Sequence, residues 1–199
     1  MTRLGRDMTS SGNGKRPWVR HLAVFLVTVA VVAGGITTLG LSVYPALSLN
    51  NAHKAISAGL GGAPVPDNTL YTVPDLASPE TAHGVSWLLG GNQDGLYTLG
   101  WLDLSKGAQV LTIPEMGTRY HNVELVVPRT GVAFANLKAA GTYVIVASGT
   151  TGVTAPAGAT VLDFPGKQVL VAGRTYVAND ADLPAARALA QQITVSPLR

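Results

Sequence analysis

The stretch LYTLGWLDLSKGAQVLTI, residues 96–113, decides the fold class because it joins two strand-like runs through a short polar turn. β-Branched and aromatic residues are prominent in these runs, and such runs predict β-strands. The intervening SKG predicts a hairpin loop in which Gly107 supplies a positive φ and Asp103 or Ser105 bonds backbone amides. The next turn-like segment is PEMG. The pattern therefore favours turn-forming roles over active-site roles for Asp103, Ser105, Lys106 and Glu115.

The chain after residue 62 continues with short apolar runs that glycine and proline separate, among them VSWLL, RYHNVELVV, TYVIVAS, ATVLDF and VLVAGRTYV. This spacing is typical of an all-β sandwich or barrel, which we expect over residues 63–199. The segment NDADLPAARALAQQI is the exception. It predicts a short helix from Pro184 to Gln192, because Asp182 lies near an N-cap position and Pro184 can occupy the first turn.

The first part of the chain has the pattern of a membrane anchor. Residues 22–43, LAVFLVTVAVVAGGITTLGLSV, carry no charge, and as a helix they would extend about 33 Å against a hydrocarbon core of about 30 Å. The basic residues before this run outnumber the acidic ones, which favours a cytoplasmic location for residues 1–21. We therefore expect a cytoplasmic tail, one transmembrane helix over 22–43, a stalk over 44–62 with one or two helical turns, and an extracytoplasmic domain on a bacterial cell membrane.

A cleaved secretory signal is the alternative to an anchor. The apolar run of a signal is usually about 7 to 15 residues long and precedes a small-x-small cleavage site, whereas this run is longer and ends in SVYPALS. The pattern therefore favours a retained anchor. Ala30 and Gly34 form a small-xxx-small pair through which two such helices could pack as a homodimer.

The charge distribution limits the class of partner. Five of the 14 basic residues and one of the 11 acidic residues precede residue 22, which leaves 9 basic and 10 acidic residues for the rest of the chain. A nucleic-acid-binding domain needs a basic surface, so we expect no nucleic-acid partner. The chain has no cysteine, and its histidines lack the spacing of metal ligands. We predict no metal and no cofactor.

The run RYHNVELVV, residues 119–127, places charged groups on an apolar face. Side chains alternate along a strand, so Arg119 and His121 share a face with three apolar residues of the run, Val123, Leu125 and Val127. A charge on such a face must be paired or must line a cavity open to water. We expect Arg119 and His121 either to be paired structurally, for example with Asp94 or Asp103, or to line a ligand pocket. Arg174, which shares its parity with Tyr176 in VLVAGRTYV, presents the same choice.

Several blocks of the sequence resemble the family catalogued as domain of unknown function 1254. GNQDGLYTLGWLDLSKG, GTRYHNVELV, GTYVIVA and VAGRTYVANDADLPAARALAQQI occur in the order of the family's blocks, over residues 68–197. The sequence departs from the family pattern at Gly95, Ala108 and His121, and it lacks the long helical N-terminal region and the second domain, family 1214, of larger members. The resemblance implies an antiparallel β-sandwich of jelly-roll type and no assigned reaction. Its signature positions are Asn92, Asp94, Tyr97, Trp101, Asp103, Arg119, Tyr120, Gly173, Arg174 and Tyr176.

Two functions from different classes fit these observations. The first is a binding or structural module at the bacterial cell envelope, with an unknown envelope ligand or protein as partner. The second is a small-molecule enzyme with a polar pocket at one end of the sandwich. The candidate pocket residues are Asn92, Asp94, Tyr97, Asp103, Arg119, Tyr120, His121, Arg174 and Tyr176. If Asp94, Arg119, His121 and Arg174 line one open pocket, the enzyme is favoured; if each is paired singly, the binding module is favoured.

Overall fold

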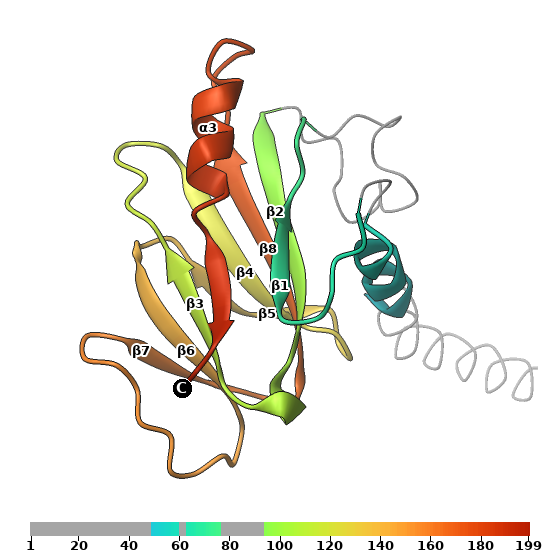
Figure 1. Cartoon of the computed structure of the whole chain (residues 1–199), viewed down its shortest axis with the longest axis vertical. Coiled ribbons are helices and arrows are strands. Elements are labelled where there is room, and N and C mark those ends of the chain that lie inside the picture. The colour runs from blue at the N-terminus through green and yellow to red at the C-terminus, as the bar shows by residue number, and fades with distance from the viewer. Residues whose placement is uncertain (1–48, 60–62, 77–93) are drawn as a thin grey trace, which may run out of the picture. The chain divides into compact units, whose positions relative to one another are not determined.

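The computed structural model describes residues 49–59, 63–76 and 94–199 (Figure 1). The chain divides into two compact units, Met1–Ser42 and Val43–Arg199, and every described residue belongs to the second unit. Among the described residues, no helix has the length and apolarity that crossing a bilayer requires. The expected tail and transmembrane segment, residues 1–21 and 22–43, lie outside the described residues.

Nine strands and one labelled helix follow one another in the described part of the chain (Figure 1). The strands are β1 (Thr69–Thr72), β2 (Gly95–Asp103), β3 (Gln109–Ile113), β4 (His121–Val127), β5 (Val132–Leu137), β6 (Gly141–Ala147), β7 (Thr160–Phe164), β8 (Gln168–Tyr176) and β9 (Thr194–Pro197). A 3-10 turn, η1 (Leu104–Lys106), follows β2, and helix α3 (Leu183–Ala190) precedes β9. The predicted C-terminal helix is therefore confirmed, and the described residues are mostly β.

The strands form two sheets. The five-stranded sheet has the order β1-β2-β8-β4-β5, and the four-stranded sheet has the order β7-β6-β3-β9. All neighbouring pairs are antiparallel except β6 and β7, which run parallel with Tyr143 opposite Thr160. The expectation of an entirely antiparallel sandwich is wrong for this pair. The long connection between β6 and β7, residues 148–159, gives the chain enough length to return and enter the sheet in the same direction.

The predicted hairpin over residues 96–113 is also wrong, because β2 and β3 lie in different sheets. Both edges of β2 are occupied, by β1 on one side and by β8 on the other, so β3 cannot pair with it. The turn residues have the roles expected of them: the Asp103 carboxylate accepts the Ser105 amide hydrogen at 3.0 Å, and Gly107 adopts φ 120°. The polar turn thus moves the chain from one sheet to the other.

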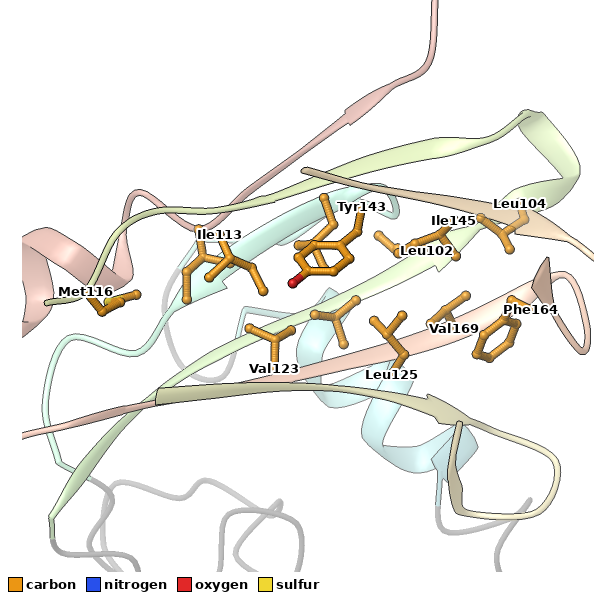
Figure 2. Close-up of a cluster of buried hydrophobic side chains, with 13 residues drawn as sticks. Leu102, Leu104, Ile113, Met116, Val123, Leu125, Tyr143, Ile145, Phe164 and Val169 are labelled. Atoms are coloured by element: carbon orange, nitrogen blue, oxygen red, sulfur yellow. The ribbon is translucent and has the colours of Figure 1, made fainter. Parts of the chain in front are cut away.

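The main core lies between the two sheets, as Figure 2 shows. Val123 and Leu125 of the five-stranded sheet lie in one apolar cluster with Ile113, Tyr143 and Ile145 of the four-stranded sheet. Val123 and Leu125 are fully buried, as the alternation of RYHNVELVV predicts. The sequence therefore determined which face of β4 enters the core.

The outer face of the five-stranded sheet carries a second apolar cluster. Tyr97, Leu99 and Trp101 of β2 alternate with the core-facing residues of the strand and point outward. A helical segment, residues 49–57, covers them with the buried side chains of Leu49, Ala52 and Ile56 (Figure 1). This part of the expected stalk contains the helical turns that the sequence predicted and packs against the sheet.

Candidate functional site

A small polar pocket lies where β2 begins and β8 ends. It has a volume of about 220 Å³ and is lined by Asp94, Gly95, Tyr120, Arg174 and Tyr176. Four of these are candidate residues from the sequence, and they come together because Gly95 is the register partner of Tyr176 in the antiparallel pair. Asn92 lies outside the described residues. The pocket is smaller than the roughly 300 to 1,000 Å³ typical of sites for drug-sized ligands.

Arg174 points to the outer face of the sheet and not into the core. Its guanidinium donates a hydrogen bond from Nη2 to the Tyr97 hydroxyl at 2.9 Å, and its Cζ atom lies 5.1 Å from the centre of the Tyr97 ring. Tyr97 is buried, with 3% of its surface exposed, so it holds the guanidinium from a fixed position. Arg174 and Tyr176 are themselves exposed, which corrects the impression that they lie on a buried face of β8.

Arg119 does not line this pocket. It forms a bidentate ion pair with Asp182, at 2.6 and 2.7 Å, and also donates to the Tyr176 carbonyl at 2.6 Å. The expected structural pairing of Arg119 is confirmed, but the example partners Asp94 and Asp103 are wrong: Arg119 precedes β4 in a turn, and the N-terminal end of α3 brings Asp182 to it. The hydrogen bond from Arg119, followed by one from the Ala178 amide, holds the pKa of Asp182 well below its usual range. The same hydrogen bond raises the pKa of Arg119.

His121 is also outside the pocket. It is the first residue of β4, and its parity with Val123 places it on the core side of the sheet. Its Nδ1 atom lies 3.2 Å from the carbonyl oxygen of Arg119, and its Nε2 atom is buried with no hydrogen-bond partner among the described residues. Of the four residues whose convergence would favour an enzyme, the structure brings together Asp94 and Arg174 and separates Arg119 and His121 from them.

Asp103 lies at the other end of β2, in the turn between the sheets. Its carboxylate accepts hydrogen bonds from the Ser105 hydroxyl at 2.5 Å and from the Ser105 amide at 3.0 Å. The hydroxyl hydrogen bond is the main cause that lowers the pKa of Asp103. Lys106 is 3.7 Å away and mostly exposed. Asp103 is therefore a structural residue of the turn, in agreement with its predicted role.

A much larger groove lies near the Asp103 end of β2. It has a volume of about 1010 Å³. Its walls come from residues 50 and 53 of the helical segment, from Trp101, from residues 127–134 around the β4–β5 connection, and from residues 165–168 before β8. Apolar side chains form most of these walls: Trp101, Val127, Pro128, Val132, Ala133, Phe134 and Pro165. The groove includes Gln168 at one end of β8 and the polar pocket includes Tyr176 at the other, and these two residues are about 26 Å apart along the strand.

A stacked pair of rings forms one wall of the groove. His53 lies on Trp101 with ring centres 4.3 Å apart and planes inclined by 15°. Asp67 holds His53 from behind, with 2.8 Å between its carboxylate and Nε2, and the Trp101 indole donates to the side chain of Gln168. Both rings are therefore fixed in position before any ligand binds.

The charges on the groove are positive. Arg129 and Lys167 line it, and the lining contains no acidic residue. Within the part of the chain that the structure describes, neither Arg129 nor Lys167 has a carboxylate within ion-pair distance. Val132 and Phe134 also line the groove and are exposed, by 61% and 38% of their surface. The groove thus combines an apolar surface with two unpaired cations, which suits a ligand with an apolar body and an anionic end.

Metal ligands do not gather in the described ranges. No three histidine, aspartate or glutamate side chains within residues 49–59, 63–76 and 94–199 come close enough to hold a metal ion together.

Comparison with protein families assigns the chain. A model of the family described as "Protein of unknown function (DUF1254)" matches residues 68–197, which is more than half of the sequence. The matched range contains all residues that line the polar pocket, and all that line the groove except Asn50 and His53 of the helical segment. The chain belongs to this family. The family assignment confirms the resemblance of the sequence blocks, and the signature positions Asp94, Tyr120, Arg174 and Tyr176 of this member lie in one pocket. No curated protein matches the chain.

A solved structure shares the fold of this chain. The VPA0106 protein from Vibrio parahaemolyticus is 21% identical with a TM-score of 0.58 over 81% of this chain. The match covers 38% of the Vibrio chain, so this member of the DUF1254 family spans well under half of that protein's length. A putative uncharacterized protein from Burkholderia cenocepacia is 17% identical with a TM-score of 0.36, over 59% of this chain and 36% of that chain, which is too low for an argument.

Sequence reasoning missed the groove, although one signal was available. Tyr97, Leu99 and Trp101 are apolar at alternate positions, and Leu96 and Leu102 are apolar on the other face of the same run. A strand that is apolar on both faces needs a cover on each side. That requirement indicates a covering element over Trp101, but it does not indicate which segment supplies it.

Proposed function

We propose that this member of the DUF1254 family is a binding module of the bacterial cell envelope, and that the groove beside Trp101 is its ligand site. The observation that carries the proposal is the combination of apolar walls with Arg129 and Lys167, two cations that have no ion-pair partner among the described residues. A ligand with an alkyl chain would bury its chain against Val132 and Phe134 and place an anionic end near the cations. Burial of apolar surface would contribute about 25 cal/mol per Å² to the affinity.

Binding is better supported than catalysis because two of the polar candidate residues, Arg119 and Asp103, form hydrogen bonds that stabilise the fold. Arg119 is engaged by Asp182, and Asp103 by Ser105. The resolved pKa shifts all favour the charged forms of these residues. A general acid or base works best with a pKa near the operating pH, and shifts in this direction move these carboxylates away from it.

The membrane placement is part of the same proposal. The uncharged run over residues 22–43 would anchor the chain with residues 1–21 in the cytoplasm and the DUF1254 domain outside. The Ala30 and Gly34 pair supports a homodimer through this segment. A lipid-derived ligand is consistent with such a location.

We describe the sandwich as a jelly roll on the basis of the family resemblance, with β8 inserted between β2 and β4.

Tryptophan fluorescence tests the ligand site. Trp18→Phe with Trp87→Phe leaves Trp101 as the reporter, since the chain has three tryptophans. The full chain, held in an amphipathic polymer, is titrated with dodecanoate and with dodecanol. We expect saturable quenching or enhancement by dodecanoate and weaker binding of dodecanol. The double variant Arg129→Gln with Lys167→Gln should weaken the affinity for dodecanoate by about three- to thirtyfold. This range corresponds to the loss of two solvent-exposed ion pairs, each at the upper part of the usual energy range for such pairs.

A matched pair of variants controls for surface charge. Val132 lines the groove and is 61% exposed, whereas Val161 is 50% exposed on β7 and is not part of the lining. Val132→Glu should weaken dodecanoate binding, because it places a carboxylate on the apolar wall that the alkyl chain contacts. Val161→Glu should leave the affinity unchanged. Equal effects from the two variants, or no saturable response in the parent chain, would show that the groove is not the site.

A further inference from the structure

We propose that the polar pocket at the other end of β8 is a separate binding site for a small monocarboxylate, with Arg174 as the group that receives the carboxylate. The site is distinct from the groove, since no residue lines both hollows. Its volume of about 220 Å³ suits a ligand of a few carbon atoms. Four of the residues that line it, Asp94, Tyr120, Arg174 and Tyr176, carry polar side chains.

Arg174 is prepared to bind an anion. A guanidinium has five N–H donors, and the Tyr97 hydroxyl is the only acceptor that the described residues offer to Arg174. No carboxylate among the described residues lies within 4.0 Å of it. The contact with the buried Tyr97 ring restrains the side chain, so less conformational entropy is lost when a ligand binds. These properties allow two parallel hydrogen bonds to one carboxylate.

The walls around Arg174 are rigid although their side chains are exposed. The Tyr176 amide donates to the Tyr120 carbonyl at 3.0 Å, which joins the two tyrosines through the backbone. The Tyr176 carbonyl in turn accepts the hydrogen bond from Arg119, which Asp182 holds in place. Arg119 is therefore a positioning residue for this pocket. The tyrosine rings present an apolar surface for the carbon atoms of the ligand and hydroxyls for its polar atoms.

Asp94 determines which anions the pocket accepts. Its presence in the lining makes the pocket neutral overall, with one arginine and one aspartate. A second negative charge on the ligand would meet the field of the Asp94 carboxylate, so the pocket should reject dianions such as phosphate. A monocarboxylate with an uncharged remainder avoids this repulsion. The structure thus favours propionate or benzoate over inorganic phosphate.

Titration of the full chain in dodecyl maltoside micelles tests this site. The probes are sodium propionate, sodium benzoate and inorganic phosphate at constant ionic strength, and the readouts are calorimetry and the NMR signals of the arginine side-chain N–H groups. We expect saturable binding of propionate or benzoate with a shift of the Arg174 signal, and at least tenfold weaker binding of phosphate. Arg174→Lys should weaken the affinity for the carboxylate at least tenfold, because lysine cannot donate two parallel hydrogen bonds to it.

Controls separate this inference from a general charge effect and from misfolding. Lys138→Gln removes another exposed cation and should leave propionate binding unchanged. Asp94→Asn should reduce the discrimination against phosphate at least threefold, and this gain of binding cannot come from an unfolded protein. The inference is overturned if neither carboxylate binds saturably, if Arg174→Lys binds as the parent does, or if phosphate competes equally with propionate.

Discussion

The ion pair between Arg119 and Asp182 should contribute a large share of the stability of the domain, and Arg119→Ala tests this. The guanidinium makes three hydrogen bonds of 2.6 to 2.7 Å, two to the Asp182 carboxylate and one to the Tyr176 carbonyl. Loss of a fully buried pair costs about 3 to 5 kcal/mol, whereas an exposed pair contributes about 0.2 to 1 kcal/mol. The side chain of Arg119 is 16% exposed and that of Asp182 is 21% exposed, so the pair lies between these limits.

We therefore expect Arg119→Ala to lower the free energy of unfolding by about 2 to 3 kcal/mol. In a protein of this size that loss lowers Tm by about 4 to 12 °C. The matched control is Lys106→Ala, because Lys106 is 66% exposed and lies 3.7 Å from its aspartate. Its effect should stay within about 0.5 kcal/mol. Thermal unfolding followed by circular dichroism measures both variants. Equal, small changes in Tm would refute the reasoning and would mean that solvent replaces the ion pair without cost.

The dependence on pH gives the same prediction an independent check. The folded state lowers the pKa of Asp182, so the ion pair contributes its full stability above the pKa of the unfolded carboxyl, about 3.9. That contribution is lost as the pH falls through the lowered pKa of the folded state. The difference in Tm between the parent chain and Arg119→Ala should therefore be constant above about pH 5 and decrease progressively in more acidic solution. A difference that does not change with acidification would mean that the partner of Arg119 is not a titrating carboxylate.

Three further predictions concern the fold and its location. Gly100→Ala should lower the free energy of unfolding by about 1 to 3 kcal/mol, because a Cβ atom there would collide with the Thr69 carbonyl oxygen and push β1 away from β2. Urea unfolding measures this loss, and an unchanged midpoint would contradict the close contact of β1 with β2 at Gly100. Asp103→Ala should lower the free energy of unfolding by about 0.5 to 2 kcal/mol in the same assay, since it removes the acceptor for the Ser105 amide. Glu115→Ala, in the connection between β3 and β4, provides the comparison. Protease added to spheroplasts should digest residues after 43 and spare residues 1–21; digestion of the tail alone would reverse the proposed orientation.

The sequence by itself determined the local features of this protein. The alternation in RYHNVELVV assigned Val123 and Leu125 to the core, and both are fully buried. The Asp182 and Pro184 signals gave the C-terminal helix within two residues of its observed ends. The order of the blocks gave the DUF1254 family. These features follow from interactions between residues near one another in the chain, such as side-chain alternation, a proline in the first turn of the helix and turn chemistry, and a local pattern is sufficient to predict them.

Only the tertiary structure decided which distant segments meet. The run over residues 96–113 has the local pattern of a hairpin, yet β8, which begins 65 positions after Asp103, occupies the edge of β2 that β3 would need. Arg119 pairs with Asp182, 63 positions later, and the groove combines segments from Asn50 to Gln168. A strand can exchange backbone hydrogen bonds with any other strand, and a charge can pair with any carboxylate that packing brings near it. Which partner a strand or a charge takes depends on the packing of the whole chain. The sequence pattern of one segment therefore does not reveal its distant partner.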